Sequence, residues 1–194
     1  MAKLRQTPSQ TVGPYFAYGL SPEQYGYQNL TSLADDQMAE GEIEGQRIRV
    51  EGCVYDGAGN VISDALIEIW QADALGRYAH PADPRGSNST FKGFGRCGTG
   101  TDARHRFWFD TIKPGKVDDD QAPHLNVIIT MRGMLLHVFT RIYFSDEPSN
   151  AIDPVLRMVP ADRRDTLIAT LQGGNVYRFD IHMQGDQETV FFDA

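Results

Sequence analysis

The chain has 194 residues, of which 41% are hydrophobic and 23% charged, a composition typical of one globular domain with its own core. The 26 acidic and 18 basic side chains give a formal charge of −8, which argues against nucleic-acid binding because that needs a basic face. No run approaches the ~18 apolar residues of a membrane helix. The N-terminus, MAKLRQTPSQ, lacks the apolar stretch of a secretion signal. We therefore expect a cytoplasmic protein that binds neither nucleic acid nor membrane.

Residues 1–45 lack any regular hydrophobic period. This segment is rich in proline and glycine, and it carries five aromatic residues between Tyr15 and Tyr27. Proline and glycine at such density interrupt both helices and strands. The sequence therefore predicts an extended N-terminal arm that packs on its own domain or on a neighbour.

Residues 46–194 alternate as strands do. In 47–56, RIRVEGCVYD, apolar residues occupy every second position, and Asp56-Gly57 follows as a turn signal. Further strands are predicted at 65–73, 105–112, 124–130, 135–144, 176–183 and 188–192, with a turn at 131–134 and a long loop over 73–100.

One helix is predicted, with Pro160 in its first turn, an apolar stripe through Leu171, and Gly173-Gly174 at its end. Many short strands with almost no helix indicate an all-β protein. We expect an antiparallel β-sandwich over 46–194, with an irregular N-terminal arm and one short helix near the C-terminus.

The stretch QAPHLNV, residues 121–127, has half the pattern of a metal site. On a strand, residues i and i+2 share a face about 7 Å apart, so two histidines there can bind one ion. Here His124 is followed by Asn126, whose neutral amide is a poor ligand for a transition metal. The pattern alone leaves three readings open: half a site, a remnant of one, or a structural histidine, and the last is the most common.

Two longer stretches, residues 50–78 and 111–127, carry a more specific pattern. The first has Gly52, Val54 and Gly59, then Ile67-Glu68-Ile69 and Gly76-x-Tyr78. Together the two stretches resemble the intradiol ring-cleavage dioxygenases, and the resemblance extends to TPSQTVGPYF near the start and YRFDIHMQG near the end. It implies a β-sandwich and a family chemistry in which two tyrosinates and two histidines hold ferric iron, a hard ion that anionic oxygen suits.

The resemblance implies that this chain has lost the iron site. The four matching ligand positions are Tyr78, Val117, His124 and Asn126, so one phenolate and one imidazole are missing. We expect that the chain binds no metal and carries no catalytic residue alone, and that Tyr78 and His124 have structural roles.

One branch of the family pairs an iron-free α chain with a homologous, iron-bearing β chain, and this sequence resembles the α chain. The features are TPSQTVGPY, the ending DQETVFF, and the spaced pattern from Arg132 to Phe144. The resemblance implies αβ units in a larger oligomer, with Fe(III) on the β chain. It implies O2-dependent cleavage of protocatechuate to 3-carboxy-cis,cis-muconate, in the β-ketoadipate pathway of aromatic catabolism. It also implies a substrate pocket to which this chain contributes Thr11, Gly13, Pro14, Tyr15 and Arg132.

Two alternatives stay open from the sequence. A non-enzymatic β-sandwich module that has lost its iron is one, although the retained arm and Arg132 argue against it. A self-sufficient catechol dioxygenase is the other, and the missing ligands argue against that.

Overall fold

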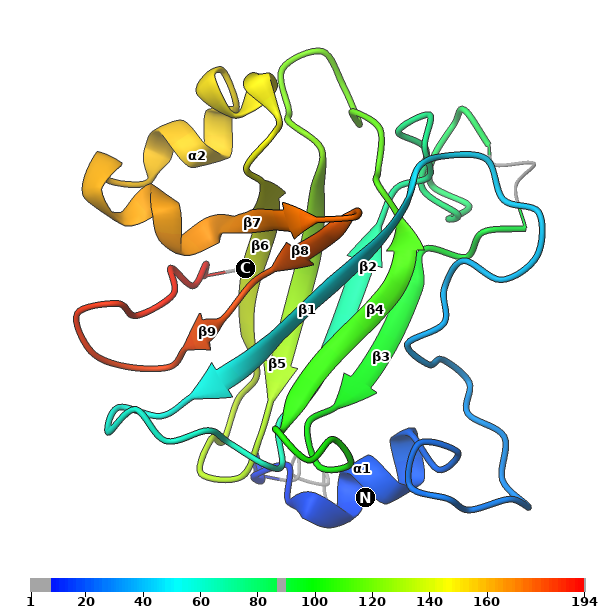
Figure 1. The fold of residues 1–194 in the computed structure, drawn as a ribbon, viewed down its shortest axis with the longest axis vertical. Helices are drawn as coiled ribbons and strands as arrows, with labels where there is room; N and C mark the ends of the chain where they lie inside the picture. The colour runs from blue at the N-terminus through cyan, green and yellow to red at the C-terminus, as the bar shows by residue number, and fades with distance from the viewer. Residues whose placement is uncertain (1–7, 87–89, 194) are drawn as a thin grey trace, which may run out of the picture.

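The structure, a computed structural model, describes residues 8–86 and 90–193, so residues 1–7 of the predicted arm lie outside the described residues. Within this part of the chain nine strands form one sheet. Eight of them follow the order β3-β2-β5-β6-β7-β8-β1-β4, and the ninth, β9, pairs with β1. The end strands β3 and β4 contact each other, so the sheet nearly closes around its core (Figure 1). The strands are β1 Arg47–Tyr55, β2 Leu66–Gln71, β3 Phe94–Gly98, β4 Arg106–Ile112, β5 His124–Thr130, β6 Val138–Phe144, β7 Ile168–Gly173, β8 Val176–Arg178 and β9 Ile181–His182.

Strand β1 shows why the alternating pattern folds as predicted. Its residues Ile48, Val50, Gly52 and Val54 are buried, while the alternate positions, Cys53 excepted, are partly or fully exposed. Burial of a large aliphatic side chain contributes about 1.5–3 kcal/mol, so the register that buries this face is strongly favoured. The same side of the sheet supplies the rest of the main core, including Ile67, Ile69, Phe107, Phe109, Leu125, Ile129, Ile142 and Phe144.

The prediction of an antiparallel β-sandwich is only partly confirmed. The protein is mostly β, but the pairs β6–β7, β1–β8 and β1–β9 are parallel. Parallel neighbours need a crossover connection, and residues 145–167 supply the one between β6 and β7. The strand predicted at 188–192 is reduced to a single bridge from Phe192 to Phe139.

The strand predicted at 176–183 is broken between β8 and β9. The backbone of Cys53 on β1 donates its hydrogen bond to the Asp180 side chain, 2.8 Å away, so a carboxylate replaces the main-chain partner. A side chain at Gly52 would collide with the carbonyl of Phe179, which explains why glycine occupies this position.

The helix predicted from Pro160 to Leu171 is wrong. Residues Pro154–Met158 form the helix α2, and Ala161–Leu167 form a 3-10 helix that ends where β7 begins. Pairing of Ala169 with Phe144 in the sheet outweighs the helical spacing of the apolar residues. The buried Asp153 caps α2 by accepting hydrogen bonds from the backbone of Val155 and Leu156, both at 2.9 Å. A further 3-10 turn covers Pro148–Ala151.

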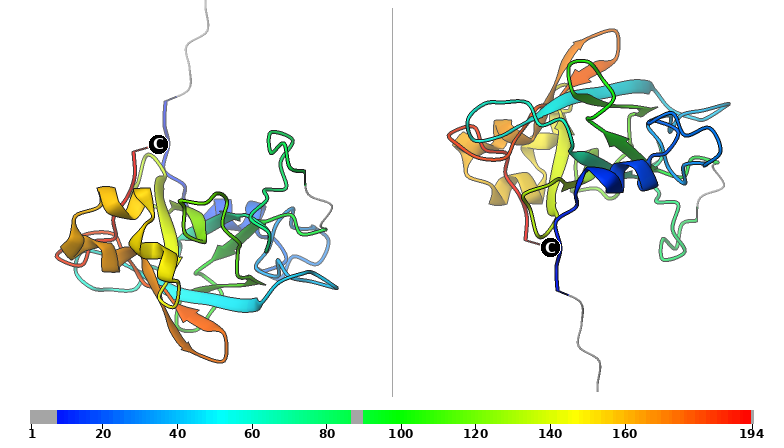
Figure 2. Two further views of the ribbon diagram at one scale, coloured as in Figure 1. Left: turned by 90° about the horizontal axis from the view of Figure 1, so that it is seen from above. Right: turned by 90° about the horizontal axis from the view of Figure 1, so that it is seen from below.

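Two further elements differ from expectation. Strand β3 lies inside the segment predicted as a loop, because Gly95 and Gly98 hide its pattern; the side chain of Met38 packs where a side chain at Gly95 would stand. The arm contains the helix α1, Pro14–Leu20, which lies across the end of the sheet (Figure 1; Figure 2). In the described residues, no helix is both long and apolar enough to cross a membrane.

Candidate functional site

The structure brings the predicted ligand positions together at the start of β5. The amide of Asn126 donates a hydrogen bond to the Tyr78 hydroxyl at 3.0 Å. Trp70 stacks on Tyr78 with ring centroids 5.7 Å apart and an angle of 14° between the planes. Tyr78 and Val117 line the same open cavity of about 500 Å³. Tyr78 therefore bonds to one predicted ligand position, Asn126, and shares a cavity with another, Val117.

His124 is held as a neutral structural histidine. It is only 3% exposed, and its Nδ1 donates to the carbonyl oxygen of Ala122 at 2.8 Å. Burial, aided by the positive charge of Arg141, lowers the pKa of His124 to about 4. The imidazole is therefore uncharged at neutral pH.

Arg141 places a positive charge among these positions. It lies on β6 directly opposite Asn126, and its Nη1 donates to Gln121 Oε1 and to the Tyr143 hydroxyl, both at 3.3 Å. No carboxylate pairs with it among the described residues. Burial raises the pKa of Tyr78, an effect that Asn126 and Arg141 only partly offset, so the phenol stays protonated.

These residues do not fit ferric iron, the metal of the family. One neutral phenol, one imidazole, an amide and a valine provide too few donors of the right type, and the guanidinium of Arg141 repels a second cation. In the described part of the chain, no group of three or more histidine, cysteine or acidic side chains is placed to hold a metal ion. No chemical step can be assigned to iron at this site.

The buried His124 makes the protein sensitive to acid. Its pKa of about 4 lies below the unfolded value of 6.5, so the unfolded chain binds a proton first as the pH falls. The contribution of His124 to the free energy of unfolding is fully present above pH 6.5. It decreases as the pH falls from 6.5 to 4, by about 3 kcal/mol at most. We expect His124→Asn, which keeps a nitrogen donor near the Nδ1 position, to flatten this part of the profile. The measurement is the thermal midpoint at pH 7.5 and 5 of the purified protein with whatever chains it retains; equal losses in both proteins would contradict the expectation.

A second group of predicted residues gathers at the other end of β5. The hydroxyl of Thr11 accepts a hydrogen bond from the Gly133 backbone at 3.0 Å and donates to the Met131 carbonyl at 3.4 Å. Gly13 caps α1, and Pro14 opens it. The turn at 131–133 is thereby fastened to the arm.

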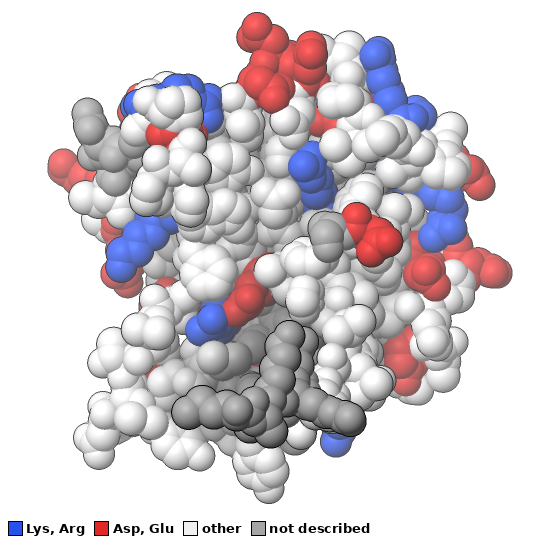
Figure 3. All heavy atoms as spheres, turned by 180° about the vertical axis from the view of Figure 1, so that it is seen from behind, with Lys and Arg blue, Asp and Glu red and all other residues white. Residues whose placement is uncertain are grey.

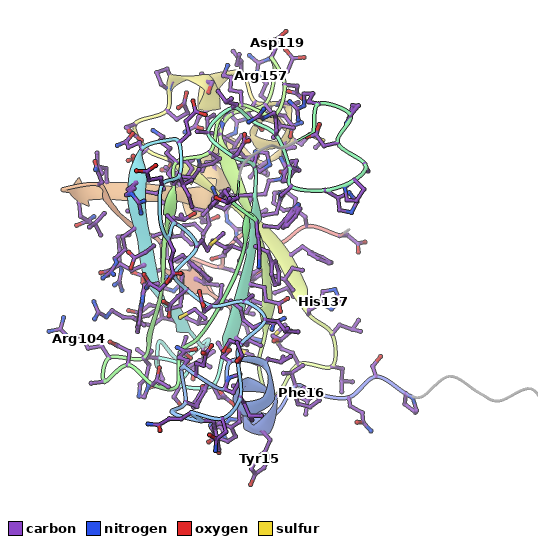
Figure 4. All side chains as sticks on the ribbon, turned by 90° about the vertical axis from the view of Figure 1, so that its right-hand side faces the viewer. Tyr15, Phe16, Arg104, Asp119, His137 and Arg157 are labelled. Atoms are coloured by element: carbon purple, nitrogen blue, oxygen red, sulfur yellow. The ribbon has the colours of Figure 1, made fainter. Side chains whose placement is uncertain are left out.

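The side chains next to the contact between Thr11 and the 131–133 turn point outward. Tyr15 is 81% exposed and projects away from the body of the protein (Figure 4). The Arg132 side chain is 65% exposed, with its Nε 2.9 Å from Asp64 Oδ2. Tyr15 and Arg132 are thus available to a group outside this chain.

The two groups are too far apart to act together within one molecule. His124 begins β5, and Arg132 follows its last residue, Thr130. At about 3.3 Å a residue, the strand alone spans roughly 20 Å. Figure 4 shows the same separation, because Tyr15 lies at one end of the molecule and Asp119, in the loop before β5, lies at the other.

Comparison with known proteins places the fold and the sequence in one family. A family model described as dioxygenase matches residues 13–185. The chain belongs to the intradiol dioxygenase family. It is 55% identical over 199 aligned residues to the protocatechuate 3,4-dioxygenase alpha chain of Burkholderia cepacia, covering 100% of both chains. It is also 34% identical to the beta chain from the same organism, over 85% of this chain and 77% of that one.

A solved structure of the family has the same fold. The intradiol ring-cleavage dioxygenase of Tetranychus urticae matches with a TM-score of 0.61 at 17% identity, over 82% of this chain and 93% of that one. The family uses non-heme Fe(III), so the present chain retains the family's architecture around a position where iron does not fit.

Sequence reasoning missed three residues of these sites. Trp70 lies in the strand predicted at 65–73 with nothing to mark it as a site residue, but it stacks on Tyr78 at the cavity wall. Arg141 and Asp64 were not singled out, because their positions follow from strand pairing and from an approach of two distant turns. The pattern TRIYF carries no sign that its arginine lies opposite one of the predicted ligand positions.

Proposed function

We propose that this chain is the iron-free α subunit of a protocatechuate 3,4-dioxygenase. The identity to an alpha chain over the full length supports this assignment, and so does the existence of a homologous beta chain. The ferric iron of the active enzyme is carried by that β chain, because the remnant positions here lack the necessary donors.

The observation that carries the proposal is the separation of the two groups along β5. Thr11 and Arg132 form a built, outward-facing site, yet they lie roughly 20 Å from this chain's own remnant ligands. Because these residues cannot reach the cavity of their own chain, we infer that they line the cavity of a neighbouring chain. We therefore assign Thr11, Gly13, Pro14, Tyr15 and Arg132 to the wall of a substrate pocket whose iron lies on the β chain.

In the proposed reaction, both atoms of O2 enter protocatechuate and the bond between its two hydroxyl-bearing carbons breaks, giving 3-carboxy-cis,cis-muconate. The ferric iron of the β chain supplies the oxygen chemistry. Arg132 binds the substrate, because its guanidinium pairs with the carboxylate that protocatechuate carries opposite its reacting hydroxyls. Such an ion needs a charged partner when it leaves water.

The surface near the arm suits a lasting partner. Large apolar side chains are exposed at this end, among them Tyr15, Phe16, Leu135 and Leu136. On the face opposite the view of Figure 1, charged side chains are scattered between uncharged areas (Figure 3). Obligate interfaces are large and apolar, so we assign this surface to contact with the β chain in αβ units that assemble further.

Two unpaired, buried cysteines, Cys53 and Cys97, agree with a reducing cytoplasm.

Expression with and without a homologous iron-bearing chain tests the proposal. Produced alone, the chain is expected to be colourless, to contain no stoichiometric iron, and to self-associate or aggregate through its uncovered apolar surface. Produced together, the two chains should purify as one complex with one iron per αβ pair and with the visible tyrosinate-to-iron absorption.

The opposite outcomes are equally clear. A coloured, iron-replete preparation of this chain alone would show a self-sufficient enzyme. A stable, monodisperse monomer that never associates with the second chain would show an independent binding module.

A further inference from the structure

Asp64 makes an ion pair beside the proposed substrate site. Its Oδ2 lies 2.9 Å from Arg132 Nε, and the Asp64 side chain is only 9% exposed while that of Arg132 is 65% exposed. No hydrogen bond of regular geometry reaches this buried oxygen among the described residues. The charge of Arg132 is therefore what offsets the cost of burying the carboxylate.

The backbone on both sides of Asp64 is fixed. Thr99 donates through its hydroxyl to the Ile62 carbonyl at 2.8 Å and accepts from the Ala65 backbone at 3.1 Å. Directly afterwards β2 begins, with Leu66 paired to Thr130 at the end of β5. Strand pairing thus brings Asp64 beside the 131–133 turn and holds it there.

The turn itself is held from the other side. Thr11 bonds to the backbone of both Met131 and Gly133, so Arg132 sits between two fastened residues. Its Nε lies 2.9 Å from Asp64 Oδ2 in an ion pair, whereas neither Nη makes a hydrogen bond within the described residues. The two Nη atoms can together donate two parallel hydrogen bonds to one carboxylate.

We propose that Asp64 is a positioning residue: it holds the guanidinium of Arg132 so that the two Nη atoms face the carboxylate of an aromatic acid substrate. The inference rests on the proposed function, because it gives Arg132 that substrate. Asp64 itself touches no substrate. Without it, a long and largely exposed side chain samples many rotamers and must be ordered when the substrate binds.

An opposing effect acts through the charge of Asp64, which repels an incoming carboxylate. Arg132 cancels most of this field, because its positive charge lies between Asp64 and the open side. Removal of Asp64 gains little attraction and releases the guanidinium into solvent. Orientation therefore outweighs repulsion.

The test uses the assembled αβ enzyme and compares protocatechuate with catechol, which has no carboxylate. For Asp64→Asn, the KM for protocatechuate is expected to rise about 5- to 20-fold with little change in kcat, while both constants for catechol stay within about twofold. Asp64→Glu keeps the charge and should recover part of the loss. In the double variant Asp64→Asn with Arg132→Ala, the Asp64 change should cost nothing further.

Asp146→Asn is a matched control, since Asp146 also pairs with a cation, Lys113, at 2.9 Å. Asp146 follows the C-terminal end of β6, far from Arg132. This variant should leave the ratio of kcat/KM for the two substrates unchanged. Equal losses for both substrates, or a lower KM for protocatechuate, in Asp64→Asn would overturn the positioning role. If Arg132→Ala alone leaves protocatechuate unaffected, the proposed substrate site fails instead. The two failures are thus distinguishable.

Discussion

Replacing Arg132 by alanine in the αβ enzyme should lower kcat/KM for protocatechuate about 10- to 150-fold. This range corresponds to the 1.5–3 kcal/mol, roughly, of a hydrogen bond to a charged group. Catechol should be affected far less, because it has no carboxylate to pair. Iron content should be unchanged, since we propose that the β chain holds the metal.

Two further variants define the result. Arg132→Lys should recover only part of the loss, because a point charge does not replace the planar fork of donors. Arg104→Ala removes another exposed arginine, whose side chain points away from Tyr15 and Phe16 in Figure 4, and should change the kinetics of neither substrate. An equal drop for both substrates in Arg132→Ala would show a general role at the interface, and no drop would make Arg132 an ordinary surface residue.

Rebuilding the iron site should require removal of the cation as well as replacement of the ligands. Val117→Tyr with Asn126→His restores the four ligand types beside Tyr78 and His124, but it leaves Arg141 opposite residue 126. Cross-strand neighbours lie about 5 Å apart, where two unit charges at an effective dielectric constant of 20 repel by about 3 kcal/mol. We expect little iron in this double variant and clearly more after Arg141→Gln is added.

The measurement is iron per chain together with the visible absorption of a tyrosinate bound to Fe(III), with the chain in its αβ complex and the β-chain contribution subtracted. Adding Tyr78→Phe to the triple variant is the control and should abolish the extra absorption. Full iron uptake by the double variant would contradict the role given to Arg141. Failure of every variant to bind iron would count against the assignment of these positions as former ligands.

Local patterns predicted the elements whose side chains alternate cleanly. β1 and β5 each bury one face, and their sequences report this directly. β3 escaped prediction because its glycines admit Met38 from another segment. The predicted helix failed because Ile168 and Leu171 fit a strand as well as a helix, and only the pairing of β7 with β6 decides between the two.

The candidate site divides in the same way. The resemblance to a family located Tyr78, Val117, His124 and Asn126, and the structure brings Tyr78, His124 and Asn126 to one end of β5. The resemblance gave no sign that Arg141 lies opposite Asn126 or that Asp64 pairs with Arg132. Both contacts join segments far apart in sequence, and they depend on strand register, which a single sequence does not display.

The length of β5 has a consequence for how such a chain can change. A ligand position replaced at the His124 end lies roughly 20 Å from the bonds of Thr11 and the ion pair of Arg132, so the replacement leaves both intact. If the arm and Arg132 line the pocket of another chain, as proposed, one copy of a duplicated gene can lose its metal by single substitutions and still contribute to that pocket from the opposite end. Neither step requires the other, so a division of labour between two chains can arise without an inactive intermediate.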